Sequence, residues 1–256
     1  MSSIPRIALV TGAGGGIGRA VALRLAAQGC DIGVADRDPA AAEQTAALVR
    51  QTGRRACLAI ADVAQREQIA PAIAGVVDTL GPIDVLVNNA GILRTAPFVA
   101  ISQQDWRDTF SINLDGAFHC TQLVLPGMLA RRSGCIVNMS SWTGKKGVPN
   151  HAAYSATKAA LIALTQSLAG EVAEQGVRVN AVCPGLIVET GMRSHAEALN
   201  RAQGLPDIDT RVRSLVPMRR PGLPTDVAGL VAFLASDDAA YMTGQAINIT
   251  GGLWMN

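Results

Sequence analysis

Short apolar runs of strand length alternate with helical patterns from the first residues of this 256-residue chain onward. The first half contains strand-like runs and helical patterns in strict turn, at residues 6–11, 16–28, 31–36, 39–52, 55–60, 65–79 and 83–89. Because strands joined through helices pair in parallel, this alternation predicts a parallel sheet that is covered by helices on both faces. No other feature of the chain narrows the possible folds as much.

The second half continues the pattern, with one interruption. Helical or strand-like stretches occupy residues 103–131, 134–140, 151–174, 177–183, 225–236 and 245–250. Residues 186–222 instead carry charges, Gly and Pro without clear periodicity, and long irregular insertions in compact domains are usually functional. We therefore expect one α/β domain over 1–256, a doubly wound Rossmann-type parallel sheet, with a substrate lid at about 186–222.

Charge and cysteine usage exclude several classes of protein. The 22 basic and 20 acidic residues are interspersed, which argues against a nucleic-acid partner. The five cysteines contain no C-x-x-C, so neither a disulfide framework nor a metal site is expected. The chain shows no signal-peptide core and no long apolar segment, which predicts a cytoplasmic protein without a membrane partner.

The segment TGAGGGIG, residues 11–18, lies between the first predicted strand and the first predicted helix. Glycines there permit a tight turn and let backbone N–H groups approach a pyrophosphate at the positive end of the helix. A tight strand-to-helix connection without a ligand is the alternative. Asp36, which closes the second predicted strand, stands where a dinucleotide fold places the carboxylate that binds the adenosine ribose.

Asp36 also bears on the choice of cofactor. A carboxylate beside the ribose repels the additional phosphate of NADP and therefore favours NAD. The adjacent Arg37 could reduce that preference. The alternative for Asp36 is a solvated loop residue or a helix cap before Pro39.

Tyr154 and Lys158 are four residues apart in a predicted helix, so their side chains share one face. Oxidation of an alcohol needs a base for the hydroxyl proton, and a nearby cation can lower the pKa of a phenol toward neutrality. Ser141, at the end of a predicted strand, can orient the substrate oxygen. A buried phenol, a surface amine and a helix cap are the structural alternatives for these three residues.

Taken in order, the motifs resemble those of the short-chain dehydrogenase/reductase family over nearly the whole chain. They are T-G-x-x-x-G-x-G at 11–18, Asp62-Val63, NNAG at 88–91, Asn113, Ser141, Tyr154-x-x-x-Lys158, and Pro184-Gly185 with Thr190. The resemblance implies a catalytic set of Asn113, Ser141, Tyr154 and Lys158, with Asn113 supporting a water that relays protons through Lys158. It also implies a homotetramer.

The resemblance assigns cofactor contacts along the chain. With the residues above, the expected set is Gly12, Gly15, Gly16, Ile17, Gly18, Asp36, Arg37, Asp62, Val63, Asn89, Ala90, Gly91, Tyr154, Lys158, Pro184, Gly185, Ile187 and Thr190. Gly15 stands where NADP-dependent relatives often carry a basic residue, so the resemblance points to NAD. Expected substrate contacts are Ser141, Trp142, His151, Tyr154 and Met192, with His195 and Leu199 as further lid residues.

Three functions remain open at this point. The leading one is NAD-dependent interconversion of a secondary alcohol, such as a polyol, sugar, cyclic alcohol or hydroxy acid, with its ketone. A 3-oxoacyl-thioester reductase that uses NADPH fits the motifs but not Asp36 and Gly15. A dinucleotide-binding regulator without turnover is disfavoured because the Asn-Ser-Tyr-Lys set is complete.

Overall fold

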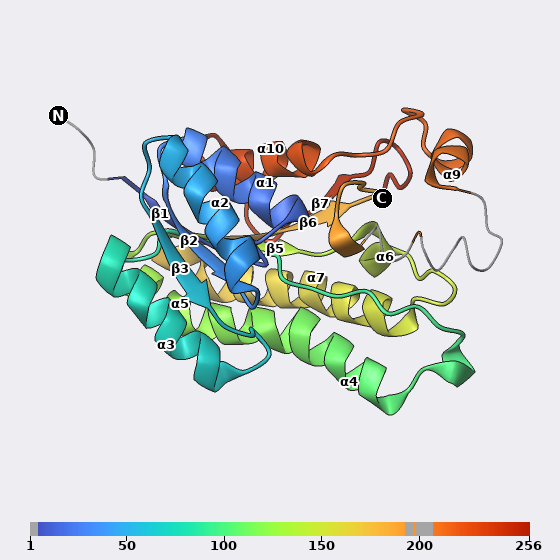
Figure 1. Ribbon diagram of the computed structural model, residues 1–256, viewed down its shortest axis with the longest axis horizontal. Coiled ribbons are helices and arrows are strands. Elements are labelled where there is room, and N and C mark those ends of the chain that lie inside the picture. Colours follow the sequence, from blue (N-terminus) through green and yellow to red (C-terminus); the bar gives the residue numbers. More distant parts are fainter. Residues whose placement is uncertain (1–4, 193–196, 198–206) are drawn as a thin grey trace.

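The computed structural model describes residues 5–192, 197 and 207–256 (Figure 1). Seven parallel strands form one sheet in the order β3-β2-β1-β4-β5-β6-β7. Their bounds are β1 Ile7–Thr11, β2 Asp31–Asp36, β3 Ala56–Ile60, β4 Val85–Asn88, β5 Gly134–Met139, β6 Val177–Pro184 and β7 Ala246–Ile249. The chain order reverses between β1 and β4, which is where sheets of this kind bind ligands. The predicted doubly wound α/β sheet is confirmed.

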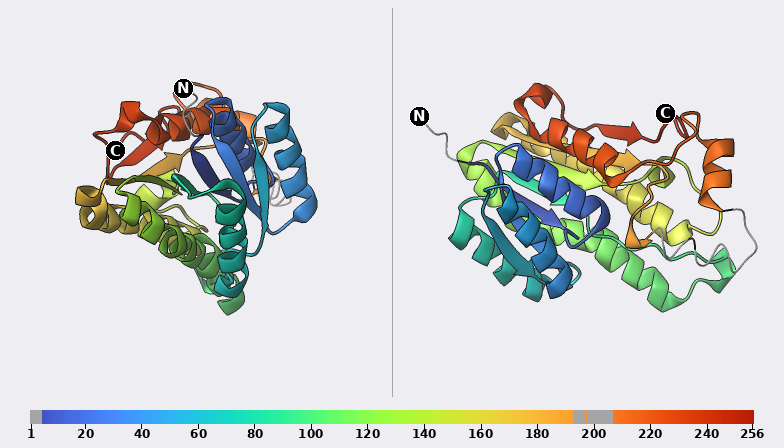
Figure 2. Two further views of the ribbon diagram at one scale, coloured as in Figure 1. Left: turned by 90° about the vertical axis from the view of Figure 1, so that its left-hand side faces the viewer. Right: turned by 45° about the horizontal axis from the view of Figure 1, so that its top comes forward.

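Helices cover both faces of the sheet (Figures 1 and 2). One face carries α1 Gly16–Ala27, α2 Pro39–Gln51 and α10 Pro224–Ala235. The other carries α3 Arg66–Leu80, α4 Gln103–Phe110, α5 Gly116–Arg131 and α7 Ala152–Val172. Each face has its own apolar core, because successive strand residues such as Leu9 and Val10 point to opposite sides and both are fully buried. None of the helices that the structure describes is both long and apolar enough to span a bilayer.

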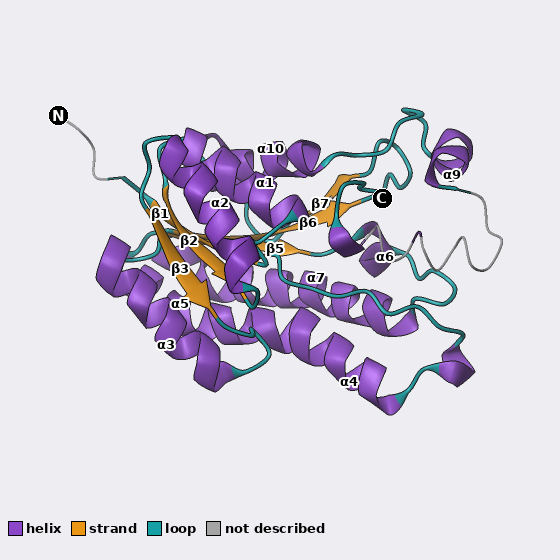
Figure 3. Cartoon of the chain, in the orientation of Figure 1, coloured by secondary structure: helices purple, strands orange, loops and turns teal. Residues whose placement is uncertain are grey.

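The helical region 103–131 is not one regular helix. A π-helical turn, η2 Ser111–Asp115, separates α4 from α5 and contains Asn113. Figure 3 draws α4 and α5 in the colour of helices. π-turns occur frequently at functional sites because they displace one side chain from the regular helical direction. The short helices η1 Phe98–Ala100, α6 Trp142–Lys145 and η4 Asp237–Ala239 were not predicted, whereas η3 Ala173–Gln175 overlaps the end of the helix predicted at 151–174.

The expected lid has a fixed base and a helix of its own. Ile187 and Gly222 form a parallel β-bridge, in which Val188 N donates to Gly222 O at 3.0 Å and Gly222 N donates to Leu186 O at 2.9 Å. Helix α9, Ile208–Leu215, lies within the segment that the sequence predicted to be irregular. The two candidate lid residues His195 and Leu199 lie outside the described residues.

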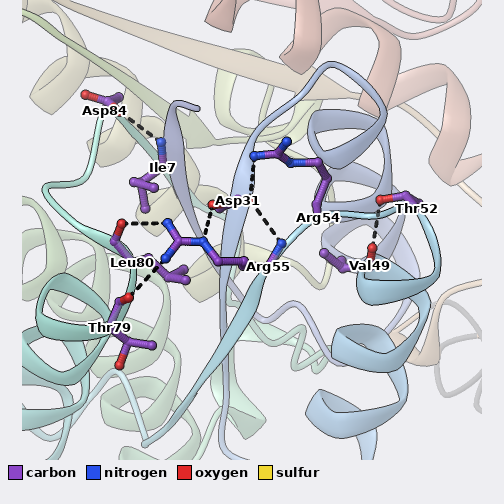
Figure 4. Close-up of polar contacts among 9 residues, drawn as sticks. All are labelled: Ile7, Asp31, Val49, Thr52, Arg54, Arg55, Thr79, Leu80 and Asp84. Atoms are coloured by element: carbon purple, nitrogen blue, oxygen red, sulfur yellow. Dashed lines mark hydrogen bonds and ion pairs between the residues drawn. The ribbon is translucent and has the colours of Figure 1, made fainter. Parts of the chain in front are cut away.

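At the amino ends of the strands, a buried carboxylate joins β2 to the start of β3 (Figure 4). Asp31 accepts hydrogen bonds from Arg54 Nη2 at 2.6 Å, Arg55 N at 3.0 Å and Arg55 Nε at 2.7 Å. Arg55 Nη2 also donates to Leu80 O at 3.0 Å, at the end of α3. Burial alone would raise the pKa of Asp31, but these hydrogen bonds outweigh it and hold the pKa below its ordinary value.

Candidate active site

Two positions of the glycine-rich loop, Gly12 and Gly18, require glycine for steric reasons. Gly12 has φ +63°, and a Cβ at Gly18 would lie 2.1 Å from Gly12 O, so neither position accepts a side chain without a shift of the backbone. The loop therefore packs directly against the first turn of α1, whose N-cap is Gly15. Gly15 has no atom within 4 Å of where its Cβ would stand, which leaves open space at the helix N-terminus.

Asp36 is bound to this loop and is not a helix cap. Its Oδ2 accepts from Gly14 N at 2.8 Å and its Oδ1 accepts from Asp38 N at 3.0 Å. Asp38, not Asp36, caps α2 by accepting from Ala40 N and Ala41 N. The carboxylate thus lies where the loop and the end of β2 meet.

A cavity of about 300 Å³ lies over this loop. Its wall contains Gly12, Gly15, Gly16, Ile17, Gly18, Asp36, Arg37, Asp62, Val63, Asn89, Ala90, Gly91 and Thr190, as well as Met192. The structure therefore brings together the cofactor residues expected at the phosphate, ribose and adenine end. Backbone N–H groups at the start of α1 and a carboxylate opposite them match the chemistry of a dinucleotide's pyrophosphate and ribose.

In the NNAG segment, 88–91, Asn88 is hydrogen-bonded inside the core, whereas the other three residues line the first cavity. Asn88 Nδ2 donates to Thr121 Oγ1 at 3.0 Å and to Asn138 Oδ1 at 2.9 Å, inside the core. Asn89 Nδ2 donates to Thr11 O at 2.9 Å and Gly12 O at 3.2 Å, which holds the glycine-rich loop in place. Sequence reasoning could not separate these two roles.

A second cavity, of about 420 Å³, joins the first through shared wall residues, among them Ile17, Gly91 and Met192. Its wall includes every expected substrate residue and the remaining cofactor residues, namely Ser141, Trp142, His151, Tyr154, Lys158, Pro184, Gly185, Ile187, Thr190 and Met192. Most of its other side chains are apolar, including Leu93, Pro97, Val148, Leu186, Leu215 and Leu253. A substrate in this cavity would lie beside a cofactor in the first.

Tyr154 and Lys158 lie on the same face of α7, as their spacing predicted. Lys158 Nζ is 5.5 Å from the centre of the Tyr154 ring and donates to Met139 O at 2.7 Å. Both side chains are at least nine-tenths buried. Burial lowers the pKa of Lys158 from 10.5 to about 8.

Ser141 follows β5 and is the N-cap of the short helix α6, Trp142–Lys145. Its Oγ accepts from Thr143 N at 3.2 Å and lies 3.1 Å from Thr143 Oγ1. The capping alternative is therefore correct, and Ser141 is also a wall residue of the large cavity. The neighbouring Ser140 Oγ donates instead to Lys158 O at 2.7 Å.

Asn113 does not line either cavity. Its Oδ1 accepts from Ile92 N at 2.7 Å, and its Nδ2 donates to Ile92 O at 3.0 Å and Thr157 Oγ1 at 3.2 Å. A methyl carbon added at Gly91 would lie 3.2 Å from Asn113 Oδ1 and 3.5 Å from Lys158 Nζ. The space beside Gly91 thus faces both Asn113 Oδ1 and Lys158 Nζ.

Gly14 and Arg211 had no individual role in the sequence reasoning, whereas Gly91 was expected only as a cofactor contact. A Cβ at Gly14 would lie 2.7 Å from Asp36 Oδ2, and Gly91 borders the space between Asn113 and Lys158. Arg211, from α9, lines the large cavity. The run of glycines at 14–16 was a signal for the first, but nothing local in the sequence marks Arg211 as a wall residue.

Comparisons with known proteins identify the family of this chain. Residues 12–254 match the family model described as "Enoyl-(Acyl carrier protein) reductase". The chain is 41% identical to the 3-oxoacyl-[acyl-carrier-protein] reductase FabG of Staphylococcus epidermidis over 251 residues, which is 97% of this chain and 98% of that protein.

Two solved structures are also similar to this chain. NAD⁺-bound xylitol dehydrogenase matches with a TM-score of 0.92 and 38% identity, covering 98% of this chain and all of that one. Levodione reductase matches with a TM-score of 0.92 and 32% identity over 96% of each chain. The chain therefore belongs to the short-chain dehydrogenase/reductase family, as an oxidoreductase whose fold binds a nicotinamide dinucleotide.

Proposed function

We propose that this protein reduces the 3-oxo group of an acyl thioester to a secondary alcohol, using a nicotinamide dinucleotide. The observation that carries the proposal is the similarity, at 41–42% identity over 97% of the chain, to 3-oxoacyl-[acyl-carrier-protein] reductases from two staphylococci. The largely apolar wall of the 420 Å³ cavity supports it, because such a wall suits an acyl chain. This assignment replaces polyol or sugar oxidation as the leading function.

In the proposed reaction, Ser141 donates a hydrogen bond to the ketone oxygen and Tyr154 transfers its phenolic proton to that oxygen. When bound, the dinucleotide supplies the hydride that reaches the ketone carbon. Lys158 favours the resulting phenolate by its positive charge, and a water beside Gly91, held by Asn113, returns a proton to Tyr154. In the oxidative direction each transfer is reversed, and Tyr154 is the general base.

We further propose that NAD(H) is preferred over NADP(H). Two wall residues of the first cavity support this preference. Asp36 places a carboxylate there, beside Gly14, and Gly15 has no side chain that could place a positive charge there. A 2′-phosphate close to that carboxylate would meet like charge at short range. Arg37 lines the same cavity and is the group that would soften this preference.

Asp36 also favours a second candidate, an NAD-dependent dehydrogenase of a polyol or another secondary alcohol. The similarity to NAD⁺-bound xylitol dehydrogenase supports this function. It requires hydroxyl partners in the substrate cavity, and Thr95, Thr143 and His151 are available in its wall. We rank it second because the apolar side chains outnumber these groups.

One set of assays separates the two candidates. The purified protein is given 3-oxobutanoyl N-acetylcysteamine thioester with NADH and with NADPH, and separately xylitol and cyclohexanol with NAD⁺, while absorbance is followed at the nicotinamide band. We expect the highest kcat/KM for the thioester with NADH. Turnover of the alcohols with none of the thioester would contradict the leading proposal, and faster turnover with NADPH would contradict the cofactor preference.

We also propose that residues 186–222 act as the substrate lid. The bridge between Ile187 and Gly222 closes the base of this segment, and Met218 N donates to Gly251 O at 3.1 Å on its return. Between these anchors the segment contributes Met192, Arg211 and Leu215 to the cavity wall. In this proposal the lid covers the substrate and also provides side chains that contact it.

A further inference from the structure

The side-chain hydroxyl of Ser141 has hydrogen-bond partners only in Thr143, among the residues that the structure describes. Thr143 N donates to Ser141 Oγ at 3.2 Å, and Thr143 Oγ1 lies 3.1 Å from the same oxygen. The two residues are 7% and 6% exposed, and both belong to the wall of the large cavity. Thr143 therefore determines which hydrogen bonds remain open to the Ser141 hydroxyl.

The directions of these hydrogen bonds follow from what each group can do. A serine hydroxyl donates one hydrogen bond and accepts two, whereas a backbone N–H only donates. The amide of Thr143 thus fills one acceptor position of Ser141 Oγ. A ketone oxygen only accepts, so when Ser141 donates its single proton to a substrate ketone, Thr143 has to be the donor in the hydroxyl pair. Ser141 then has both acceptor positions filled.

This arrangement has a consequence in each direction of the reaction. In reduction, Thr143, Ser141 and the ketone oxygen form a chain of hydrogen bonds, and such chains polarise one another as negative charge develops on the oxygen. In oxidation, a Ser141 whose acceptor positions are filled does not accept the proton of the substrate hydroxyl. That proton is therefore directed to Tyr154, the proposed general base.

The segment that carries the hydroxyl pair is packed directly on α7. A Cβ at Gly144 would lie 2.7 Å from the carbonyl carbon of Lys158, so α6 approaches the backbone of α7 as closely as glycine allows. Before the pair in the chain, Ser140 Oγ donates to Lys158 O at 2.7 Å. These contacts hold Ser141 and Thr143 at a fixed place beside α7.

We infer that Thr143 is a positioning residue of the reaction, whose hydroxyl donates to Ser141 Oγ and thereby makes Ser141 a donor to the reacting oxygen of the substrate. Thr143 contacts no reacting atom in this assignment. The inference rests on the role of Ser141 in the proposed function, and oxidation of a secondary alcohol would give Ser141 the same role. The effect is expected in kcat, because the chain of hydrogen bonds strengthens in the transition state.

The test begins with two variants of Thr143, assayed with 3-oxobutanoyl N-acetylcysteamine thioester and the preferred cofactor. Thr143→Val keeps the backbone N–H and nearly the same volume but removes the hydroxyl, and should lower kcat about tenfold with little change in dinucleotide binding. Thr143→Ser restores the hydroxyl and should keep kcat near the wild-type value. The matched control is Thr109→Val, which removes a buried threonine hydroxyl of α4 outside both cavity walls.

A double-mutant cycle with Ser141→Ala separates positioning from packing. If the Thr143 hydroxyl acts through Ser141, Thr143→Val should change kcat by less than about twofold once Ser141 is alanine. If the Thr143 side chain only packs between α6 and its surroundings, Thr143→Val should cause the same loss in both backgrounds. Should Thr143→Val fail to fold, as judged by thermal melting, Thr143→Ala removes the same hydroxyl and takes its place in the cycle.

A loss that depends on Ser141 and is rescued by Thr143→Ser, with little change in Thr109→Val, supports the inference. Equal losses in both backgrounds, near-normal turnover of a folded variant without the hydroxyl, or a Thr143→Ser protein as slow as Thr143→Val would overturn it. Failure of the wild type to reduce the thioester would instead contradict the proposed function, and the same cycle is then measured on oxidation of xylitol or cyclohexanol with NAD⁺. The two failures are therefore distinguishable.

Discussion

The ammonium group of Lys158 lies 5.5 Å from the centre of the Tyr154 ring and is hydrogen-bonded to Met139 O at 2.7 Å. Helical spacing places the two side chains on one face of α7, and the last residue of β5 fixes the position of the cation. The position of the charge beside the phenol therefore depends on how α7 packs on the sheet. Both parts of this arrangement can be tested.

Tyr154→Phe should lower kcat by about 10²- to 10⁴-fold, because it removes the proposed proton donor and acceptor but keeps the ring. Binding of the dinucleotide, measured by fluorescence titration, should change little. The matched control is Tyr241→Phe, which alters the chain's other tyrosine at a fully exposed position. A folded Tyr154→Phe protein with near-normal turnover would falsify the assignment.

Lys158 predicts an unusual dependence of stability on pH. Its pKa is about 8 in the folded protein, because of burial, whereas an unfolded lysine titrates near 10.4. Between these values the unfolded chain binds more protons, so the free energy of unfolding rises with pH. From pH 8 to 10 the wild type should therefore gain on the order of 2 kcal/mol relative to Lys158→Met.

Urea denaturation of both proteins in this pH range provides the measurement. Groups that titrate in both proteins cancel in the difference between wild type and variant. The contrary result is a difference that stays constant or falls as the pH rises, which would mean that the folded state does not lower the pKa of Lys158.

Asp36→Ala should shift the NAD/NADP ratio of kcat/KM toward NADP by on the order of 100-fold, because Arg37 could then approach the 2′-phosphate. Asp36→Asn separates charge from structure, since an amide oxygen can still accept from Gly14 N. Asp38→Asn, two residues away and exposed, is the matched control. A wild type that already prefers NADP would show that this carboxylate does not select the cofactor.

Gly91→Ala should lower kcat by about tenfold or more at saturating substrate, because the new methyl group would occupy the space between Asn113 Oδ1 and Lys158 Nζ. Gly147→Ala is a suitable control, since that position has no neighbour within 4 Å of the added carbon. Unchanged turnover in Gly91→Ala would argue against a proton relay through this space.

Asp31→Asn should lower the free energy of unfolding by about 2 kcal/mol at pH 7, because Arg54 and Arg55 lose a buried charged acceptor (Figure 4). The pKa of Asp31 is lowered in the folded state, so this contribution is present above the ordinary carboxyl pKa and disappears as the pH falls through the folded value. Chemical denaturation at pH 7 and pH 3 measures it. A difference that is as large at pH 3 would contradict the ionic origin.

The sequence by itself determined the fold and indicated most of the candidate site residues. Alternating apolar periods specify a parallel sheet with two covered faces, since each run must bury its apolar side. The glycines at 12 and 18 and the four-residue spacing of Tyr154 and Lys158 are local features, and local geometry alone predicts what they do. These parts of the site could be inferred without knowing how the elements pack.

Tertiary structure decided the contacts that join distant segments. The binding of Asn113 to Ile92, the placement of Gly91 between Asn113 and Lys158, and the return of α9 to the substrate cavity each join elements far apart in the chain. Periodicity reports which side of an element is buried but not what it packs against. The ion pair between Arg211 and Glu197 forms only because tertiary packing brings the two side chains together, which no local pattern in the sequence encodes.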